Sequence, residues 1–330
     1  MTTAVEEISS RRVLDRKPTV SILSVAYNHA KYIGACIESA MLQAAPFSLE
    51  MVIGEDCSTD GTRDICREYQ RRYPERVRLL LPERNTGSFE NFRRVLAACR
   101  GEYIALLEGD DYWTAPDKLA VQVELLRAHT DWSACIHNVT VINEQGVHAP
   151  RPFFETDPGP VFRAEDFVER NFVPTCSCVF RRREPLGLPD WYYDPQANPY
   201  PDWILHVVNA RHGPFGYIHR ILGVHRRHAG GIWGGTFDGT VEGDIQRMLK
   251  RKIAFERLQE CVDPHLGAAV RRQRALNAFH LSLAYREKGD WPSVRRYLWK
   301  AFRADRSAGI PFFRSALIAA VPVLRRIGTR

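Results

Sequence analysis

Four short apolar segments occur at nearly regular intervals in the first 107 residues, and apolar residues at helical spacing follow each of them. The apolar segments, at 20–26, 49–54, 77–81 and 103–107, have the length of buried strands. The segments that follow carry apolar side chains three or four positions apart, as in helices that cover a sheet. Repeated alternation of strand and helix favours a parallel sheet with helices on its faces. The sequence therefore predicts an α/β fold.

The pattern continues in a less regular form and then changes. A helix with Leu119, Val123 and Leu126 is followed by predicted strands at 133–142 and 174–181, a loop at 183–201, a helix at 203–209 and one or two strands at 215–225. From residue 240 to about 305 only helices are predicted, and 284–302 resembles a single tetratricopeptide hairpin. We expect a flexible lead-in at 1–17, an α/β domain at 18–235, a helical extension at 240–305 and a basic amphipathic tail at 306–330.

Charge is distributed unevenly along the chain. Residues 1–240 contain 27 Lys and Arg against 31 Asp and Glu, whereas residues 241–330 contain 19 against 8. The two regions are therefore expected to meet different partners. The basic residues lie on ordinary helical patterns without a nucleic-acid-binding motif, so no nucleic-acid partner is predicted.

The sequence also bears on location. Residues 1–7 lack a basic stretch followed by an apolar run, and no segment approaches the roughly 20 apolar residues of a membrane span. The eight scattered cysteines are typical of reduced thiols. We expect a cytoplasmic protein, with the tail either peripheral on an anionic membrane face or docked on the protein's own surface.

Carboxylates follow two of the predicted strands. Asp56 comes after the second strand, and Glu108, Asp110 and Asp111 come after the fourth. Ligands of parallel sheets bind beyond the carboxyl ends of the strands. A solvated turn with a capping Asp is one interpretation, but clustered negative charge is costly unless a cation offsets it. Oxygen ligands suit Mg²⁺ or Mn²⁺, which favours a metal site.

Five motifs follow one another in order: Val20…Ala26-Tyr27-Asn28, Glu55-Asp56-x-Ser58-Thr59-Asp60-Gly61-Thr62, Asn85-x-Gly87, Gly101-Glu-Tyr-Ile and Glu108-Gly109-Asp110-Asp111-Tyr-Trp. Together they resemble the family 2 glycosyltransferases of the Rossmann-like GT-A fold, over residues 18–235. The resemblance implies an enzyme that transfers a sugar, with inversion, from a nucleoside diphosphate donor. It also implies a mostly parallel sheet, here followed by a helical extension.

The resemblance also implies roles for single residues. Asp110 would ligate Mg²⁺ or Mn²⁺, and Asp111 would serve the metal's surroundings or the donor sugar. Asp56 would accept a hydrogen bond from the nucleoside, and Asp60 would support that loop. Glu108 stands where the family often has Asp, so its role is the least defined. The residues expected at the nucleotide sugar are Ala26, Tyr27, Asn28, Asp56, Asp60, Glu108, Gly109, Asp111, Arg226 and Trp233.

Two later motifs complete the resemblance. In Tyr200-Pro-Asp202-Trp203, Asp202 is the expected general base, with a helix N-cap as the alternative role. The segment from His225 to Trp233 resembles the one that closes over the diphosphate, with His228 as a second metal ligand or, alternatively, an ordinary hydrogen-bonded histidine.

The implied partners are a UDP- or dTDP-sugar donor and a glycan or lipid-linked acceptor in cell-surface polysaccharide assembly. A second copy of the chain in a homodimer is a further candidate partner. Two other functions stay open. A nucleotidyltransferase on a related fold would release pyrophosphate rather than a nucleoside diphosphate. A catalytically inactive scaffold would be expected to lack a carboxylate, yet Asp56, Asp110 and Asp202 are all present.

Overall fold

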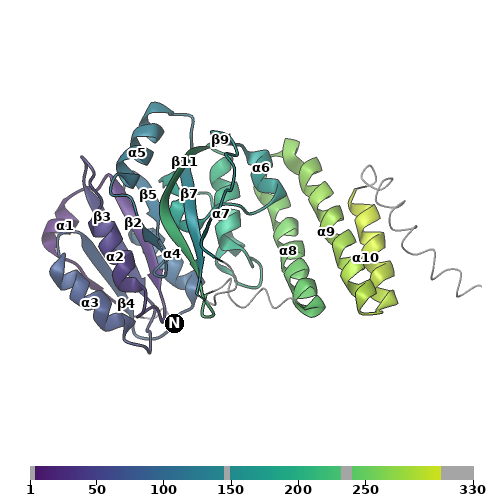
Figure 1. The fold of residues 1–330 in the computed structure, drawn as a ribbon, viewed down its shortest axis with the longest axis horizontal. Coiled ribbons are helices and arrows are strands. Elements are labelled where there is room, and N and C mark those ends of the chain that lie inside the picture. The colour runs from purple at the N-terminus through teal and green to yellow at the C-terminus, as the bar shows by residue number, and fades with distance from the viewer. Residues whose placement is uncertain (1–3, 145–148, 232–239, 306–330) are drawn as a thin grey trace, which may run out of the picture.

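A computed structural model describes residues 4–144, 149–231 and 240–305, and Figure 1 shows a central sheet with a row of helices on one side. Four parallel strands form one half of the sheet, in the order β4 (Val77–Pro82), β3 (Leu49–Glu55), β2 (Val20–Ala26) and β5 (Tyr103–Leu106). Helices α2 (Ile33–Met41), α3 (Thr62–Arg72) and α4 (Ser88–Ala98) connect these strands. This half has the predicted order of strands and helices.

The two faces of the parallel half follow from the alternation of side chains along its strands. Ile22 and Met51 point to the face covered by α2, where Ile37 is buried with them. Leu23 and Val52 point to the opposite face, where they share a core with Val95 of α4. Both faces are therefore apolar, which explains the nearly continuous apolar strands in the sequence.

The other half of the sheet is mixed. Strand β10 (Val179–Arg181) lies antiparallel between β5 and β7 (Ala134–Asn143), and β11 (Phe215–Arg227) runs parallel to β7. Short strands β6 (Tyr112–Trp113), β8 (Arg151–Pro152) and β9 (Val161–Phe162) add to β11 and β7. Around this half lie α5 (Lys118–Ala128), α6 (Ala164–Glu169), α7 (Pro201–Ala210) and the short 3₁₀ helices Thr175–Ser177 and Asp190–Tyr193.

The lead-in differs from the expectation of a flexible segment. Within residues 4–17, β1 (Val5–Ile8) pairs antiparallel with β4 at the edge of the sheet, and α1 (Arg11–Asp15) follows it. The guanidinium of Arg78 on β4 donates to Glu7 on β1. The polar sequence of β1 shows no apolar alternation because the strand lies at an exposed edge, so its pairing was not visible in the pattern.

The C-terminal extension consists of α8 (Val241–Cys261), a 3₁₀ turn (Pro264–Leu266), α9 (Gly267–Glu287) and α10 (Trp291–Ala304). Phe255 of α8 packs edge-on against Trp203 of α7, with 5.2 Å between ring centroids. Stacked Tyr285 and Tyr297 join α9 to α10. The extension thus shares a core with the sheet region. No helix in 4–144, 149–231 or 240–305 is long and apolar enough to cross a bilayer, and the predicted tail at 306–330 lies outside the described residues.

Candidate active site

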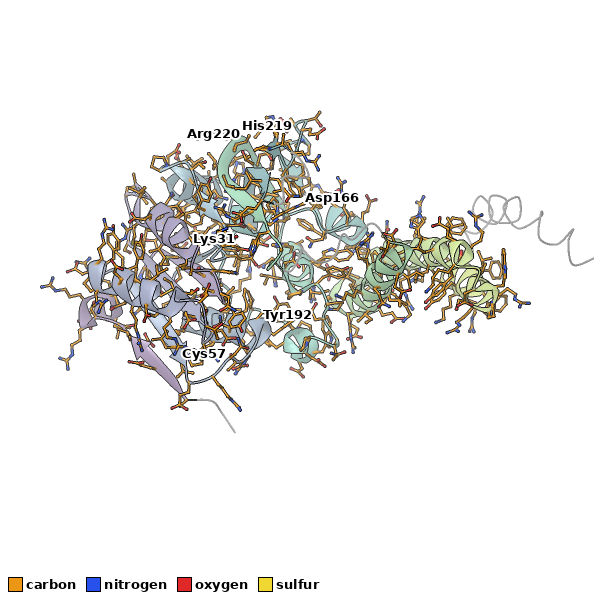
Figure 2. The ribbon with its side chains drawn as sticks, turned by 60° about the horizontal axis from the view of Figure 1, so that its bottom comes forward. Lys31, Cys57, Asp166, Tyr192, His219 and Arg220 are labelled. Carbon is orange, nitrogen blue, oxygen red and sulfur yellow. The ribbon has the colours of Figure 1, made fainter. Side chains whose placement is uncertain are left out.

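Most of the predicted site residues lie where β2, β3, β5 and β11 end, and Asp202 lies in the first turn of α7. The loop after β2 carries Tyr27 to Lys31, and the loop after β3 carries Asp56 to Gly61. Figure 2 labels Lys31 and Cys57 on these two loops. Glu108 to Asp111 follow β5, and β11 brings Arg226 and His228 alongside them.

Short polar contacts hold the first two loops together. Asn28 has a positive φ of 56°, a conformation that asparagine tolerates better than most residues. Its amide oxygen accepts from the backbone N–H of Thr59 at 2.9 Å, and its own backbone N–H donates to Ser58 at 2.9 Å. Asp60 accepts from the backbone N–H of Ala30 and from Thr62, which lowers the pKa of Asp60 despite the opposing effect of burial. Just before Asn28, Ala26 is buried and Tyr27 is exposed.

Asp56 makes several hydrogen bonds within the protein. It is 1% exposed, and its carboxylate accepts from the backbone N–H and hydroxyl of Thr86 and from the backbone N–H of Gly87 at 2.7–3.1 Å. Asp56 therefore anchors the turn at 85–87, and its expected contact with the nucleoside stays a prediction. The donors lie about 30 positions away, where the sequence pattern could not connect them.

Asp110 and His228 form a close pair. The Nε2 atom of His228 lies 3.0 Å from the Asp110 carboxylate. Burial opposes ionisation of Asp110, but this hydrogen bond and nearby His29 hold the pKa of Asp110 below its usual range. The Arg226 guanidinium donates to the backbone carbonyl of Asp110 at 2.9 Å and also to Glu144.

Asp111 holds the end of β11 in place. Its carboxylate accepts from the backbone N–H of Arg226 at 2.7 Å and lies 3.1 Å from Nδ1 of His225. Burial opposes protonation of His225, but Asp111 raises its pKa above the usual value. Asp111 thereby positions the segment that carries Arg226 and His228.

The carboxylates and imidazoles fit a divalent cation. One oxygen each from Glu108, Asp110 and Asp111 lie within 4.8 Å of one another, and Asp110 forms a similar group with His29 and His228. Burial, reinforced by the neighbouring carboxylates, raises the pKa of Glu108 well above its usual value. Such a concentration of negative charge is what a cation would relieve.

Asp202 lies in the first turn of α7. Tyr200 is the N-cap and Pro201 begins the helix, so the capping role for Asp202 is wrong. Asn171 donates to its carboxylate at 2.7 Å, and burial raises the pKa of Asp202.

Asp202 and Glu108 line one pocket, together with Phe89, Phe92, Tyr192, Tyr200 and, from α8, Arg247 and Lys250.

The structure adds residues that the sequence had not singled out. His29 lies next to the Asp110–His228 pair. Its position directly after Tyr27-Asn28, which the sequence places at the donor, could have identified it as a candidate site residue. Gly109 sits against the His29 ring, where a Cβ would come within 2.8 Å of Nδ1. Asn171, Arg247 and Lys250 carried no such signal. The predicted contact Trp233 lies outside the described residues.

Comparison with known proteins gives a family match. A sequence model described as "Glycosyl transferase family 2" matches residues 21–186, about half of the chain. An uncharacterized protein of Mycobacterium tuberculosis is 40% identical over 222 residues, which is 66% of this chain and 61% of the relative. A putative teichuronic acid biosynthesis glycosyltransferase of Bacillus subtilis, TuaG, is 35% identical over 52% of this chain and 65% of its own length. The chain thus matches less than two thirds of these relatives.

Two solved structures share the fold. S. aureus TarS, in complex with UDP-GlcNAc, aligns with a TM-score of 0.52 at 15% identity and covers 87% of this chain and 92% of its own. The mannosyltransferase PcManGT from Pyrobaculum calidifontis, in complex with GDP-Man and Mn²⁺, aligns with a TM-score of 0.54 at 18% identity, over 94% and 86%.

Proposed function

Since the chain belongs to glycosyl transferase family 2, we propose that it transfers a sugar from a nucleoside diphosphate donor to an acceptor hydroxyl, with inversion at the anomeric carbon. One observation carries the proposal. Glu108, two residues from Asp110 of the Asp110–His228 pair, lines the same pocket as the partly buried carboxylate Asp202. A group suited to hold a diphosphate through a cation and a group suited to take a proton therefore lie on neighbouring parts of one site.

The donor side would be held by Asp110 and His228 through Mg²⁺ or Mn²⁺. A cation there would offset the negative charge that develops on the departing diphosphate. The Arg226 guanidinium, held over Tyr32 at 4.8 Å, adds positive charge beside it. PcManGT is in complex with GDP-Man and Mn²⁺, and TarS is in complex with UDP-GlcNAc. These complexes support a nucleotide-sugar donor for this chain, and we favour a UDP- or dTDP-sugar.

The acceptor side would be served by Asp202. A base works best when its pKa approaches the operating pH, and burial moves the pKa of Asp202 upward in that direction. Asn171 orients the carboxylate by donating to one oxygen. The acceptor hydroxyl would lose its proton to Asp202 as its oxygen bonds to the anomeric carbon, and the nucleoside diphosphate would leave on the opposite face.

The setting we propose is cell-surface polysaccharide assembly, on the strength of the name of TuaG. The acceptor would be a glycan or a lipid-linked glycan. Arg247 and Lys250 on the pocket wall would suit an acceptor with a negatively charged group.

The test is a panel of nucleotide sugars with the purified chain and Mn²⁺. We expect one donor to be consumed with release of its nucleoside diphosphate, and Asp202→Asn to abolish transfer while keeping donor binding. Release of pyrophosphate in a parallel assay with nucleoside triphosphates and sugar 1-phosphates would identify a nucleotidyltransferase, and binding of donors without turnover on any acceptor would favour an inactive scaffold.

A further inference from the structure

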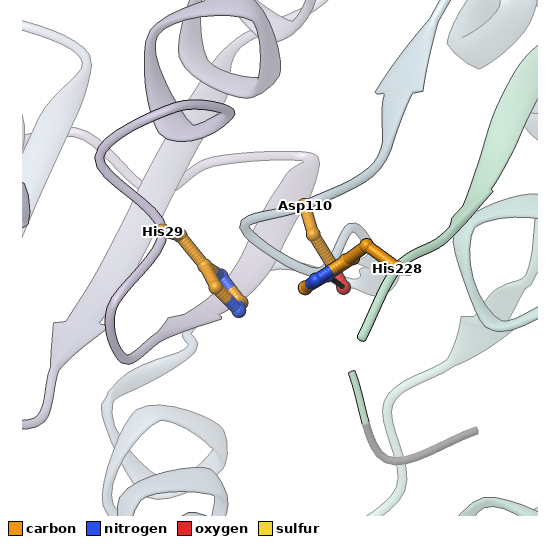
Figure 3. A group of neighbouring side chains, drawn as sticks. All are labelled: His29, Asp110 and His228. Atoms are coloured by element: carbon orange, nitrogen blue, oxygen red, sulfur yellow. Dashed lines mark hydrogen bonds and ion pairs between the residues drawn. The ribbon is translucent and has the colours of Figure 1, made fainter. Parts of the chain in front are cut away.

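The proposed donor site holds more candidate ligands than the two expected from the sequence. We propose that His29 is a third protein ligand of the cation, so that the site consists of His29, Asp110 and His228 (Figure 3). This inference rests on the proposed function for the diphosphate, but its test is a binding measurement that does not need turnover.

The three side chains converge from separate segments of the chain. One ligand atom from each lies within 4.8 Å of the other two. The His29 and His228 rings stand edge to face, with centroids 6.1 Å apart. Ligand atoms bonded to one ion at about 2.1 Å lie about 3.0 Å apart at right angles and about 4.2 Å apart on opposite sides of it, so modest side-chain adjustments would close the site.

The His29 imidazole has an unused polar atom. Its Nδ1 is buried and has no hydrogen-bond partner among the described residues. Buried polar atoms in proteins are nearly always paired, so an unpaired one calls for an explanation. Coordination to a cation supplies one, since a neutral imidazole nitrogen is a good metal ligand.

The backbone around His29 is held from both sides. Its N–H donates to the hydroxyl of Thr62 at 2.8 Å, and its carbonyl accepts from the backbone N–H groups of Tyr32 and Ile33, where α2 begins. Because a Cβ at Gly109 would come within 2.8 Å of Nδ1, only glycine leaves room for the ring. The loop, the helix start and Gly109 thus all serve to place this imidazole beside Asp110.

The rival arrangement uses carboxylates alone, from Glu108, Asp110 and Asp111. Both oxygens of Asp111 are already engaged, one by the backbone N–H of Arg226 and the other by His225. Asp111 would have to release the end of β11 to bind a cation. The arrangement with two imidazoles replaces only the hydrogen bond between Asp110 and His228, which are themselves ligands, and leaves coordination positions open for diphosphate oxygens.

The types of ligand atom determine which metal the site prefers. Imidazole nitrogen is a good ligand for transition metals, whereas Mg²⁺ prefers oxygen. We therefore expect tighter binding of Mn²⁺ than of Mg²⁺, and His29→Ala should reduce Mn²⁺ affinity by about 10- to 100-fold. Mg²⁺ affinity should fall much less, so the preference for Mn²⁺ should shrink.

The experiment titrates the full chain with Mn²⁺ alone and follows free Mn²⁺ by electron paramagnetic resonance, with Mg²⁺ measured by competition. Pulsed spectra of bound Mn²⁺ should show nitrogen couplings that weaken in His29→Ala. The matched control is His219→Ala, because His219 lies half-exposed on β11 away from the cluster (Figure 2). Thermal denaturation checks folding, and His29→Gln replaces the alanine variant if that does not fold.

A second variant tests the same idea from the other side. Gly109→Ala should displace the ring and lower Mn²⁺ affinity, and the double variant with His29→Ala should be little worse than His29→Ala alone. Unchanged Mn²⁺ affinity and unchanged nitrogen couplings in His29→Ala would overturn the inference while leaving glycosyl transfer intact. Failure of wild-type protein to turn over any donor, with these metal results as expected, would instead overturn the proposed function.

Discussion

Lys118 offers a direct test of how burial shifts the charge state of a side chain. It is 0% exposed, and its ammonium nitrogen has no hydrogen-bond partner among the described residues. It lies 3.8 Å from the centre of the Trp113 ring. Burial raises the pKa values of the neighbouring thiols of Cys135, Cys176 and Cys178, so these thiols carry no charge that would compensate the ammonium group.

Burial lowers the pKa of Lys118 from 10.5 to about 7. The unfolded chain then binds more protons than the folded protein between these two values, so stability rises as pH rises through this window. With one pKa unit equal to about 1.4 kcal/mol, the buried amine costs about 4 kcal/mol at pH 7 and about 2 kcal/mol at pH 9. Below pH 7 the cost approaches its limit of about 5 kcal/mol.

The substitution Lys118→Met keeps the length of the side chain and a favourable sulfur contact with the indole ring, and it removes the amine. We expect the variant to be more stable than wild type by about 4 kcal/mol at pH 7 and by about 2 kcal/mol at pH 9. Urea denaturation followed by circular dichroism at both values measures the difference. Comparing the two proteins at each pH cancels the titration of all other groups.

The control is Lys17→Met, which removes an exposed lysine and should change stability by less than about 0.5 kcal/mol at either pH. A Lys118→Met variant that is less stable than wild type at pH 7 would refute the reasoning. So would a stability difference that does not change between pH 7 and pH 9. Either result would mean that the folded protein stabilises the charged ammonium.

Three further predictions follow from single contacts. Asp202→Asn should lower turnover at least ~100-fold without lowering Tm, and near-normal turnover in the variant would exclude Asp202 as the base. Wild-type turnover should fall with decreasing pH, with a midpoint above the usual aspartate pKa. Asp56→Asn should reduce the free energy of unfolding by about 2 kcal/mol, because its amide group would face the N–H donors of Thr86 and Gly87; unchanged urea denaturation would remove its anchoring role. Glu50→Gln should cost about 3–5 kcal/mol in the same assay, since it removes the buried negative charge that pairs with both Arg78 and Arg100, and a loss below 1 kcal/mol would contradict this.

The sequence by itself determined the family and the parallel half of the sheet. Buried strands such as β2 and β3 are apolar on both faces, and the helices between them show their own period, so local pattern was sufficient. The carboxylates at 108–111 were found for the same reason, because the apolar pattern of a strand also shows where the strand ends. The domain boundaries and the roles of the site residues remain predictions, and the tail at 306–330 and Trp233 lie outside the described residues.

Tertiary structure alone decided which groups these carboxylates meet. Asp110 and His228 are 118 positions apart, and only the pairing of β11 with β7 and β6 brings them within 3.0 Å. Asp56 became an anchor because the turn at 85–87 folds onto it, and His29 entered the site because Gly109 leaves space for its ring. The periods of helices and strands depend on residues that are neighbours along the chain. The hydrogen-bond partner of a carboxylate oxygen depends instead on which distant donor the fold brings next to it. That is why the residue types of the site could be predicted from the sequence and their partners could not.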